Sequence, residues 1–261
     1  MLKRFSLTKL GDKMEPESGW YIEWFNEDYL ATYPHRNEDA AYAESAFVGE
    51  TLGLAPNALV LDLCCGAGRH MVGTASMVGR VVGLDLSPVL LRQARDLLDR
   101  AGVYAPLVRA DMRRLPFRPV FDAVTSFFTS FGYFEDDTEN FAVLTEISQS
   151  LKSGGRFMLD LMHAEYVRAN LVPSSLRTVG DMTIREERSI DEDRCRVNKR
   201  ITIERADTTK TYRESVRMYS LDEVVAAIER AEMRVTDVYG DFRGTPFDKE
   251  SARMIIMGTK P

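Results

Sequence analysis

The sequence predicts an α/β fold with a mostly parallel, seven-stranded sheet, helices on both faces, and an antiparallel β insertion. Three observations carry this prediction. Short apolar segments alternate with helix-like segments from residue 38 to residue 162. Period-two patterning then replaces this alternation between residues 181 and 219. A capped helix and two further strand-like segments follow, and they complete the sheet.

The first half of the chain supplies five of the expected strands and the helices between them. The strands are expected over residues 58–63, 80–85, 105–109, 121–127 and 156–161. A first helix is expected over 38–52. Ser87 and Pro88 are the N-cap and first-turn proline of a second helix, which Gly102 ends. A third, over 137–152, stops before a turn at Gly154 and Gly155.

The second half begins with three segments of alternating polarity, which indicate an antiparallel meander. They span residues 181–190, 195–206 and 210–219. Val197, Ile201 and Ile203 share one face of the middle segment, and the other face is charged in both signs. Ser220 and Glu223 form a capping box that opens a helix reaching about residue 231. The last strands are expected over 233–239 and 252–259.

The residues that point most clearly to a binding site lie at the end of the first expected strand. Asp62 stands just before a turn that contains Gly66 and Gly68. Glycines at this place let the backbone approach a ligand at the carboxyl end of the strand. Asp85 ends the next strand, seventeen residues after Gly68, where a carboxylate can accept ribose hydroxyls. Together these residues predict a nucleoside-binding site.

The spacing distinguishes between nucleoside-binding families. A dinucleotide fingerprint needs a third glycine where this chain has Met71, and no Gly-Lys-Ser/Thr follows for a P-loop. The pattern Asp62-x-x-x-Gly66-x-Gly68 instead resembles motif I of the class I S-adenosylmethionine (SAM) methyltransferases. Asp111 resembles the residue that contacts adenine in that family. Residues 121–128 and 151–160 resemble its fourth and fifth strands, so the resemblance covers roughly residues 55–162 and implies a Rossmann-like core.

The resemblance implies SAM as the cofactor and assigns residues to it. Tyr33 and Arg36 would close over the cofactor and meet its carboxylate, and Phe127 would face the sulfonium with its π surface. His163, just after the fifth strand, and Tyr33 are the catalytic candidates. The aromatic residues from Trp20 to Tyr29 have the spacing of a buried helix stripe, and His70 is expected to pack or hydrogen-bond. The expected cofactor-binding residues are Asp62, Cys64, Gly66, Gly68, Asp85, Leu86, Asp111, Met112, Phe127, Tyr33 and Arg36.

The same resemblance divides the chain into four parts. Residues 1–36 form an aromatic-rich cap segment, and residues 37–162 form the SAM-binding core. Residues 163–219 form the antiparallel insertion, which acts as an acceptor lid or an oligomer contact. Residues 220–261 supply the last helix and the last two strands of the core.

The expected reaction is in-line transfer of the sulfonium methyl group to a nitrogen or oxygen of a small molecule. A base is needed only if the nucleophile arrives protonated. The segment after the fourth strand begins Ser126-Phe-Phe-Thr and lacks the Asn/Asp-Pro-Pro-Tyr/Phe of base-amine methyltransferases, and no cysteine follows a proline. The closest resemblance is therefore to small-molecule N-methyltransferases.

Two alternatives remain open. A tRNA or rRNA methyltransferase would use two basic clusters, although interleaved acids favour solvated faces and a net charge of −6 opposes RNA binding. The clusters are Arg109, Arg113, Arg114 and Arg118, and Arg194, Arg196, Lys199 and Arg200. The second alternative is a non-catalytic SAM-binding or scaffold protein, with the meander as a partner interface.

Composition indicates the number of domains and the cellular compartment to be expected. The chain has 261 residues, 44% of them hydrophobic, which suits one domain with an insertion. Three cysteines and three histidines predict neither a disulfide framework nor a metal site. The N-terminus lacks the apolar core of a signal peptide, and no apolar run is long enough to span a membrane. We therefore expect a cytoplasmic protein, with a homodimer as one option.

Overall fold

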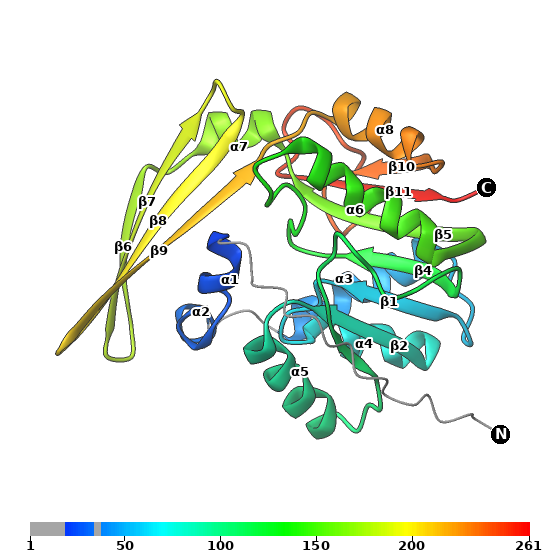
Figure 1. Cartoon of the computed structure of the whole chain (residues 1–261), viewed down its shortest axis with the longest axis horizontal. Coiled ribbons are helices and arrows are strands. Elements are labelled where there is room, and N and C mark those ends of the chain that lie inside the picture. The colour runs from blue at the N-terminus through cyan, green and yellow to red at the C-terminus, as the bar shows by residue number, and fades with distance from the viewer. Residues whose placement is uncertain (1–18, 34–37) are drawn as a thin grey trace.

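The computed structural model of the chain describes residues 19–33 and 38–261 (Figure 1). Its main sheet has seven strands in the order β10-β11-β5-β4-β1-β2-β3. The five strands from β1 to β5 are parallel, whereas β11 runs antiparallel to β5 and β10 antiparallel to β11. This confirms the predicted mostly parallel sheet. The strands are β1 (Leu59–Leu63), β2 (Arg80–Asp85), β3 (Leu107–Arg109), β4 (Phe121–Ser126), β5 (Leu151–Met162), β10 (Arg234–Tyr239) and β11 (Arg253–Thr259).

Helices cover both faces of this sheet. Side chains that alternate along β1 therefore enter two different parts of the core. Leu61 and Leu63 enter the core beneath α6 and α8, while Val60 enters the core beneath α3 and α4. A strand covered on both faces is apolar at every position except where chemistry requires otherwise, and in β1 that exception is Asp62. The helices are α3 (Glu38–Thr51), α4 (Arg69–Val78), α5 (Pro88–Arg100), α6 (Asp137–Ser150) and α8 (Leu221–Arg230).

A second sheet of four antiparallel strands stands beside the core, in the order β6-β7-β8-β9 (Figure 1). The meander of β7 (Met182–Asp191), β8 (Arg196–Arg205) and β9 (Thr208–Arg217) was predicted, but the sheet also contains β6 (Ser174–Val179). The edge strand β6 has the sequence Ser-Ser-Leu-Arg-Thr-Val, and its Leu176 is 60% exposed. With so few apolar residues, the segment lacks the hydrophobic pattern from which a strand is predicted. The short helix α7 (Ala164–Asn170) was not predicted either.

One boundary in the core differs from expectation. The sequence predicts a turn at Gly154 and Gly155, but β5 begins at Leu151 and runs through both glycines. Gly154 adopts φ +74°, and the pairing with β4 shifts register between Phe121 and Ala123. The glycines therefore allow a local irregularity inside a strand rather than a separate turn.

The N-terminal aromatic segment folds into two short helices, α1 (Trp20–Trp24) and α2 (Glu27–Thr32), which lie between the two sheets (Figure 1). The side chain of Asn26 accepts from the Asp28 and Tyr29 amides and so starts α2. Trp24 is fully buried against Ile201 and Ile203 of the second sheet. Part of the aromatic stripe is thus core, as its spacing predicted.

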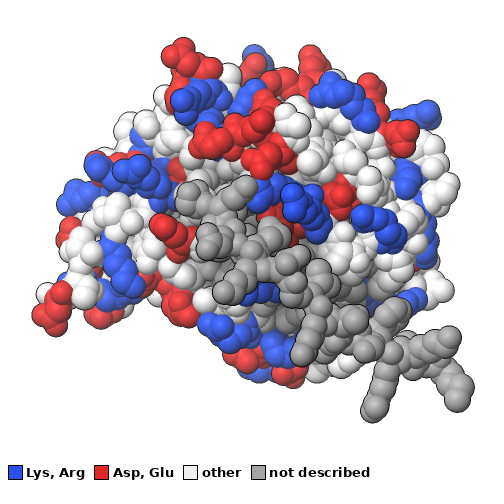
Figure 2. Space-filling view, in the orientation of Figure 1, with Lys and Arg blue, Asp and Glu red and all other residues white. Residues whose placement is uncertain are grey.

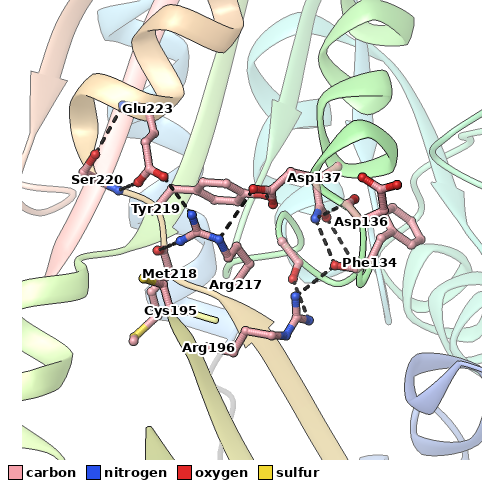
Figure 3. Close-up of polar contacts among 12 residues, drawn as sticks. Phe134, Asp136, Asp137, Cys195, Arg196, Arg217, Met218, Tyr219, Ser220 and Glu223 are labelled. Carbon is pink, nitrogen blue, oxygen red and sulfur yellow. Dashed lines mark hydrogen bonds and ion pairs between the residues drawn. The ribbon is translucent and has the colours of Figure 1, made fainter. Parts of the chain in front are cut away.

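Two arginines fix the second sheet to the core (Figure 3). Arg196 is only 3% exposed and donates from Nη1 to the Phe134 carbonyl oxygen at 2.9 Å. Arg217 donates to Glu223 at 2.7 Å. The prediction of a solvated basic face is therefore wrong for Arg196, which is an internal clamp, and for Lys199, whose side chain faces inward and is 20% exposed.

Candidate functional site

A cavity of about 480 Å³ lies between the carboxyl ends of β1, β2 and β4, the second sheet, and helices α1 and α2. Its volume is in the range of small-ligand sites. Of the predicted cofactor residues, the lining includes Tyr33, Asp62, Cys64, Gly66, Asp85, Leu86, Asp111, Met112 and Phe127. The structure thus brings together residues that lie as far apart in the sequence as Tyr33 and Phe127.

The two glycines of the loop after β1 have different tasks. Gly66 has φ +55°, and a Cβ added there would meet no atom within 4 Å, so the loop leaves open space at the cavity wall. Gly68 has φ +80° and precedes α4, and its added Cβ would lie 3.0 Å from the Ala94 Cβ. Gly66 therefore leaves room for a ligand, whereas Gly68 lets the start of α4 pack against α5.

Asp85 links this loop to the end of β2. Its Oδ2 accepts from the Gly66 amide at 2.9 Å, and its Oδ1 accepts from the Ser87 amide at 2.8 Å. Burial raises the pKa of Asp85, while these backbone donors act against the rise. The carboxylate therefore shapes the glycine loop and also faces the cavity.

Asp62 carries a buried carboxyl oxygen that no described residue satisfies. The residue is 2% exposed, and among the described residues Oδ2 has no hydrogen-bond partner. Burial raises its pKa to about 8, the charge of Asp85 adds to the rise, and Arg69 opposes it. A buried, unpartnered carboxyl oxygen on a cavity wall fits a ligand that brings its own donor. The ammonium of the methionine part of SAM is such a donor.

Asp111 and Met112 form the wall beyond Asp85. The Asp111 carboxylate accepts from the Arg113 backbone amide at 2.8 Å and pairs with the Arg113 guanidinium at 2.7 Å. Met112 contacts the loop after β1, with its sulfur 3.5 Å from that of Cys64. Both residues line the cavity.

The end of β4 forms an aromatic wall with a strained backbone. Phe128 and Thr129 have φ +59° and +53°, a conformation that costs non-glycine residues about 1–3 kcal/mol each. Asp160 of β5 holds both, because its Oδ2 accepts from the Phe128 amide at 2.7 Å and its carbonyl oxygen accepts from the Thr129 amide at 2.9 Å. The Phe127 ring stacks on His70 at 3.9 Å. The wall is therefore pre-formed.

His70 has the packing and hydrogen-bonding role that the sequence predicts. Besides stacking on Phe127, its Nε2 lies 2.8 Å from a carboxylate oxygen of Glu44. Burial lowers the pKa of His70, an effect that Glu44 opposes.

Three other predicted residues need separate placement. Arg36 lies outside the described residues. His163 is not among the cavity-lining residues; its Nδ1 lies 2.7 Å from the Ser251 carbonyl oxygen, so it fixes the segment before β11. Tyr33 does line the cavity, where its hydroxyl donates to Glu186 and accepts from Lys199, both at 3.1 Å.

The site also contains residues that sequence reasoning did not assign to it. The second sheet contributes Lys199, Glu214 and Val216, and the N-terminal segment contributes Trp20 and Phe25. One signal was available for Lys199. It has the same parity along β8 as Val197, Ile201 and Ile203, which places it on the inward face.

Within residues 19–33 and 38–261, no group of three or more His, Cys, Asp or Glu side chains could hold a metal ion. None of the helices in the same ranges is long and apolar enough to cross a membrane.

Comparison with known proteins agrees with this geometry. Residues 60–155 match a family described as a methyltransferase domain. The cypemycin N-terminal methyltransferase of a Streptomyces species is 29% identical over 203 residues, which cover 76% of this chain and 81% of the relative.

Two further relatives match over about half of the chain. A dTDP-3-amino-3,4,6-trideoxy-α-D-glucopyranose N,N-dimethyltransferase of Streptomyces venezuelae is 31% identical and covers 49% of this chain and 52% of its own. A ubiquinone/menaquinone biosynthesis C-methyltransferase of Burkholderia vietnamiensis is 34% identical and covers 45% and 48%. The chain thus spans about half the length of these two.

Solved structures share the whole fold. A SAM-dependent methyltransferase of Clostridium acetobutylicum superposes with a TM-score of 0.75 at 18% identity, covering 89% of this chain and 97% of that one. An amino pentose methyltransferase of Micromonospora echinaspora, solved with SAM bound, gives 0.66 at 23% identity, covering 90% and 97%.

Proposed function

We propose that the chain is a class I SAM-dependent methyltransferase, and that it transfers the SAM methyl group to a nitrogen or oxygen of a small molecule. The observation that carries this proposal is the grouping of Asp62, Gly66 and Asp85 on one cavity wall. The wall offers an unpartnered carboxyl oxygen, an open backbone cradle and a second carboxylate. These groups match the ammonium, the chain and the ribose of SAM.

The residues of the site have separable tasks in this reaction. Asp62 and the loop at Gly66 would bind the methionine part, Asp85 the ribose, and Asp111 and Met112 the adenine. SAM supplies an already activated methyl group. The protein's remaining work is to orient the acceptor and exclude water, for which the wall of Phe127 and Phe128 is suited. Tyr33 at the opposite side is proposed to help close the cavity.

Several observations favour a small acceptor over RNA. The cavity lies between two sheets, and most of its acceptor side is aromatic. On the face drawn in Figure 2, Lys and Arg are interspersed with Asp and Glu, without a continuous basic surface. Arg196 is occupied internally. RNA binding relies on accessible cations, so this distribution supports a small molecule.

The first test is calorimetric titration with S-adenosylhomocysteine, the demethylated product, with NAD as the control ligand. We expect the product to bind and NAD not to bind. Asp85→Ala should weaken product binding at least tenfold, about 1.4 kcal/mol, because the ribose contact and the support of the Gly66 amide are both lost. Asp96→Ala, which alters an exposed residue of α5, is the matched control.

An absence of product binding to the wild type would remove the proposed function. Binding without turnover of any acceptor would instead favour the SAM-binding scaffold. The cytoplasmic setting and the homodimer stay predictions, and light scattering of the purified chain tests the latter.

A further inference from the structure

An ion pair interrupts the apolar inner face of the second sheet. Lys199 of β8 and Glu214 of β9 are direct cross-strand partners, with Nζ and Oε2 2.6 Å apart. Each side chain is 20% exposed, and Ile201 and Ile203 on the same face are fully buried. A largely buried ion pair contributes little net stability compared with apolar residues of the same size. Stability therefore does not account for the pair.

Both side chains line the cavity, and their contacts leave capacity for a ligand. Glu214 accepts from Lys199 and, through Oε1, from the Trp24 indole at 2.5 Å. A carboxylate has about four acceptor positions, so these two contacts do not saturate it. The described rings of Trp20, Tyr29 and Tyr133 also line the cavity and can pack on the body of a ligand.

We propose that Glu214 and Lys199 form the acceptor subsite, and that the acceptor is a primary or secondary amine whose N–H donates to the Glu214 carboxylate. This inference rests on the proposed methyl transfer. In that step the amine lone pair forms the N–C bond as the S–C bond breaks. S-adenosylhomocysteine leaves as a neutral sulfide, the positive charge passes to nitrogen, and the nitrogen then releases a proton to water.

The subsite fits an amine better than a hydroxyl group. A hydroxyl acceptor must lose its proton during transfer and so needs a strong base. Burial by itself would lower the pKa of Lys199, but Glu214 and Tyr33 outweigh burial and raise this pKa above its ordinary value. Lys199 therefore remains a protonated donor. Burial raises the pKa of Tyr33, which therefore remains a neutral hydroxyl. The negative charge of Glu214 favours the protonated form of a bound amine, and the positive charge of Lys199 offsets this effect, so that the neutral, nucleophilic form remains accessible.

The experiment uses the full chain loaded with S-adenosylhomocysteine and three probe pairs in which an amine and a hydroxyl group occupy the same position. The pairs are cyclohexylamine with cyclohexanol, glucosamine with glucose, and alanyl-alanine with lactoyl-alanine. The two tryptophans of the chain, Trp20 and Trp24, both belong to this region, so intrinsic fluorescence reports binding. We expect at least one amine to titrate the signal, and its hydroxyl partner to bind at least tenfold more weakly.

Variants separate this inference from the proposed function. Glu214→Gln should weaken binding of the amine at least tenfold and leave calorimetric affinity for S-adenosylhomocysteine unchanged. The double variant Lys199→Met/Glu214→Gln, which leaves no unpaired lysine, should show the same loss. Glu204→Gln, on the outward face of β8, is the matched control and should bind like the wild type.

Three outcomes overturn the inference: no amine binds, hydroxyl partners bind as well as amines, or Glu214→Gln keeps wild-type amine affinity. In all three, binding of S-adenosylhomocysteine leaves the methyltransferase proposal standing. If S-adenosylhomocysteine itself fails to bind the wild type, the proposed function fails and this inference falls with it.

Discussion

Replacing Asp62 by asparagine tests the electrostatics of the cofactor wall directly. The side chain is buried, its Oδ2 is unpartnered among the described residues, and its pKa is raised from 3.8 to about 8. An acid with a raised folded-state pKa binds its proton more tightly in the folded protein. Folding is therefore favoured below the unfolded pKa, and that advantage is lost as the pH rises toward 8.

The magnitude follows from the size of the shift. Each pKa unit corresponds to about 1.4 kcal/mol, so roughly three units between pH 5 and pH 8 give an upper limit of about 4 kcal/mol. Asparagine has nearly the same shape but does not titrate. We expect the free energy of unfolding of the wild type to fall between these pH values by about 2–4 kcal/mol more than that of Asp62→Asn.

The assay is urea unfolding of the ligand-free wild type and Asp62→Asn at pH 5 and pH 8. Other titrating groups, such as Asp28 and Asp241 with their lowered pKa values, are common to both proteins and cancel in the difference. Parallel pH profiles would refute the reasoning. Calorimetry in two buffers of different ionisation enthalpy adds a second readout. Binding of S-adenosylhomocysteine should release a proton from the wild type near pH 7 and less from the variant, because the ligand ammonium ionises Asp62.

Two further substitutions test the glycine loop after β1 and the contact of Arg196 between the second sheet and the core. Gly66→Val should abolish binding of S-adenosylhomocysteine in calorimetry, because the valine side chain fills the open space beside the loop. Valine must also adopt the φ of +55° found at this position, which should lower the free energy of unfolding by about 1–2 kcal/mol. Retained affinity would place the cofactor elsewhere. Arg196→Met removes donors to the Phe134 and Ser215 carbonyl oxygens and should lower the free energy of unfolding by about 2–4 kcal/mol in urea. An unchanged urea midpoint would mean that Arg196 does not clamp the sheets.

Most of the cofactor wall could be predicted from the sequence because its residues are local to strand ends. Asp62, Gly66 and Gly68 lie within seven positions, and Asp85 ends the neighbouring strand β2. In a parallel sheet the carboxyl ends of adjacent strands meet at one edge, so reading the strands also places these residues together. The antiparallel meander could be predicted for a similar reason, since its alternation repeats every two residues.

The part of the cavity wall that the N-terminal segment, the end of β4 and the second sheet form was decided by tertiary structure. It joins residues near 20–33, 127–134 and 199–216, which no local pattern connects. Lys199 reads as part of a basic surface cluster, yet it lies on the inner face of β8, where it pairs with Glu214 of the neighbouring strand. His163 directly follows β5, as predicted, yet its hydrogen bond to Ser251 holds it away from the cavity lining.

The sequence by itself determined the sheet and the glycine loop, because short-range periodicity and steric demands on the backbone depend on neighbouring residues. The resemblance of that loop to motif I then implied the cofactor class. Only the tertiary structure decided which charges are buried, which carboxyl oxygen lacks a partner and which side chains of the second sheet line the cavity. These properties depend on desolvation and on contacts between segments more than a hundred residues apart, so they arise only when the two sheets and the N-terminal helices pack together.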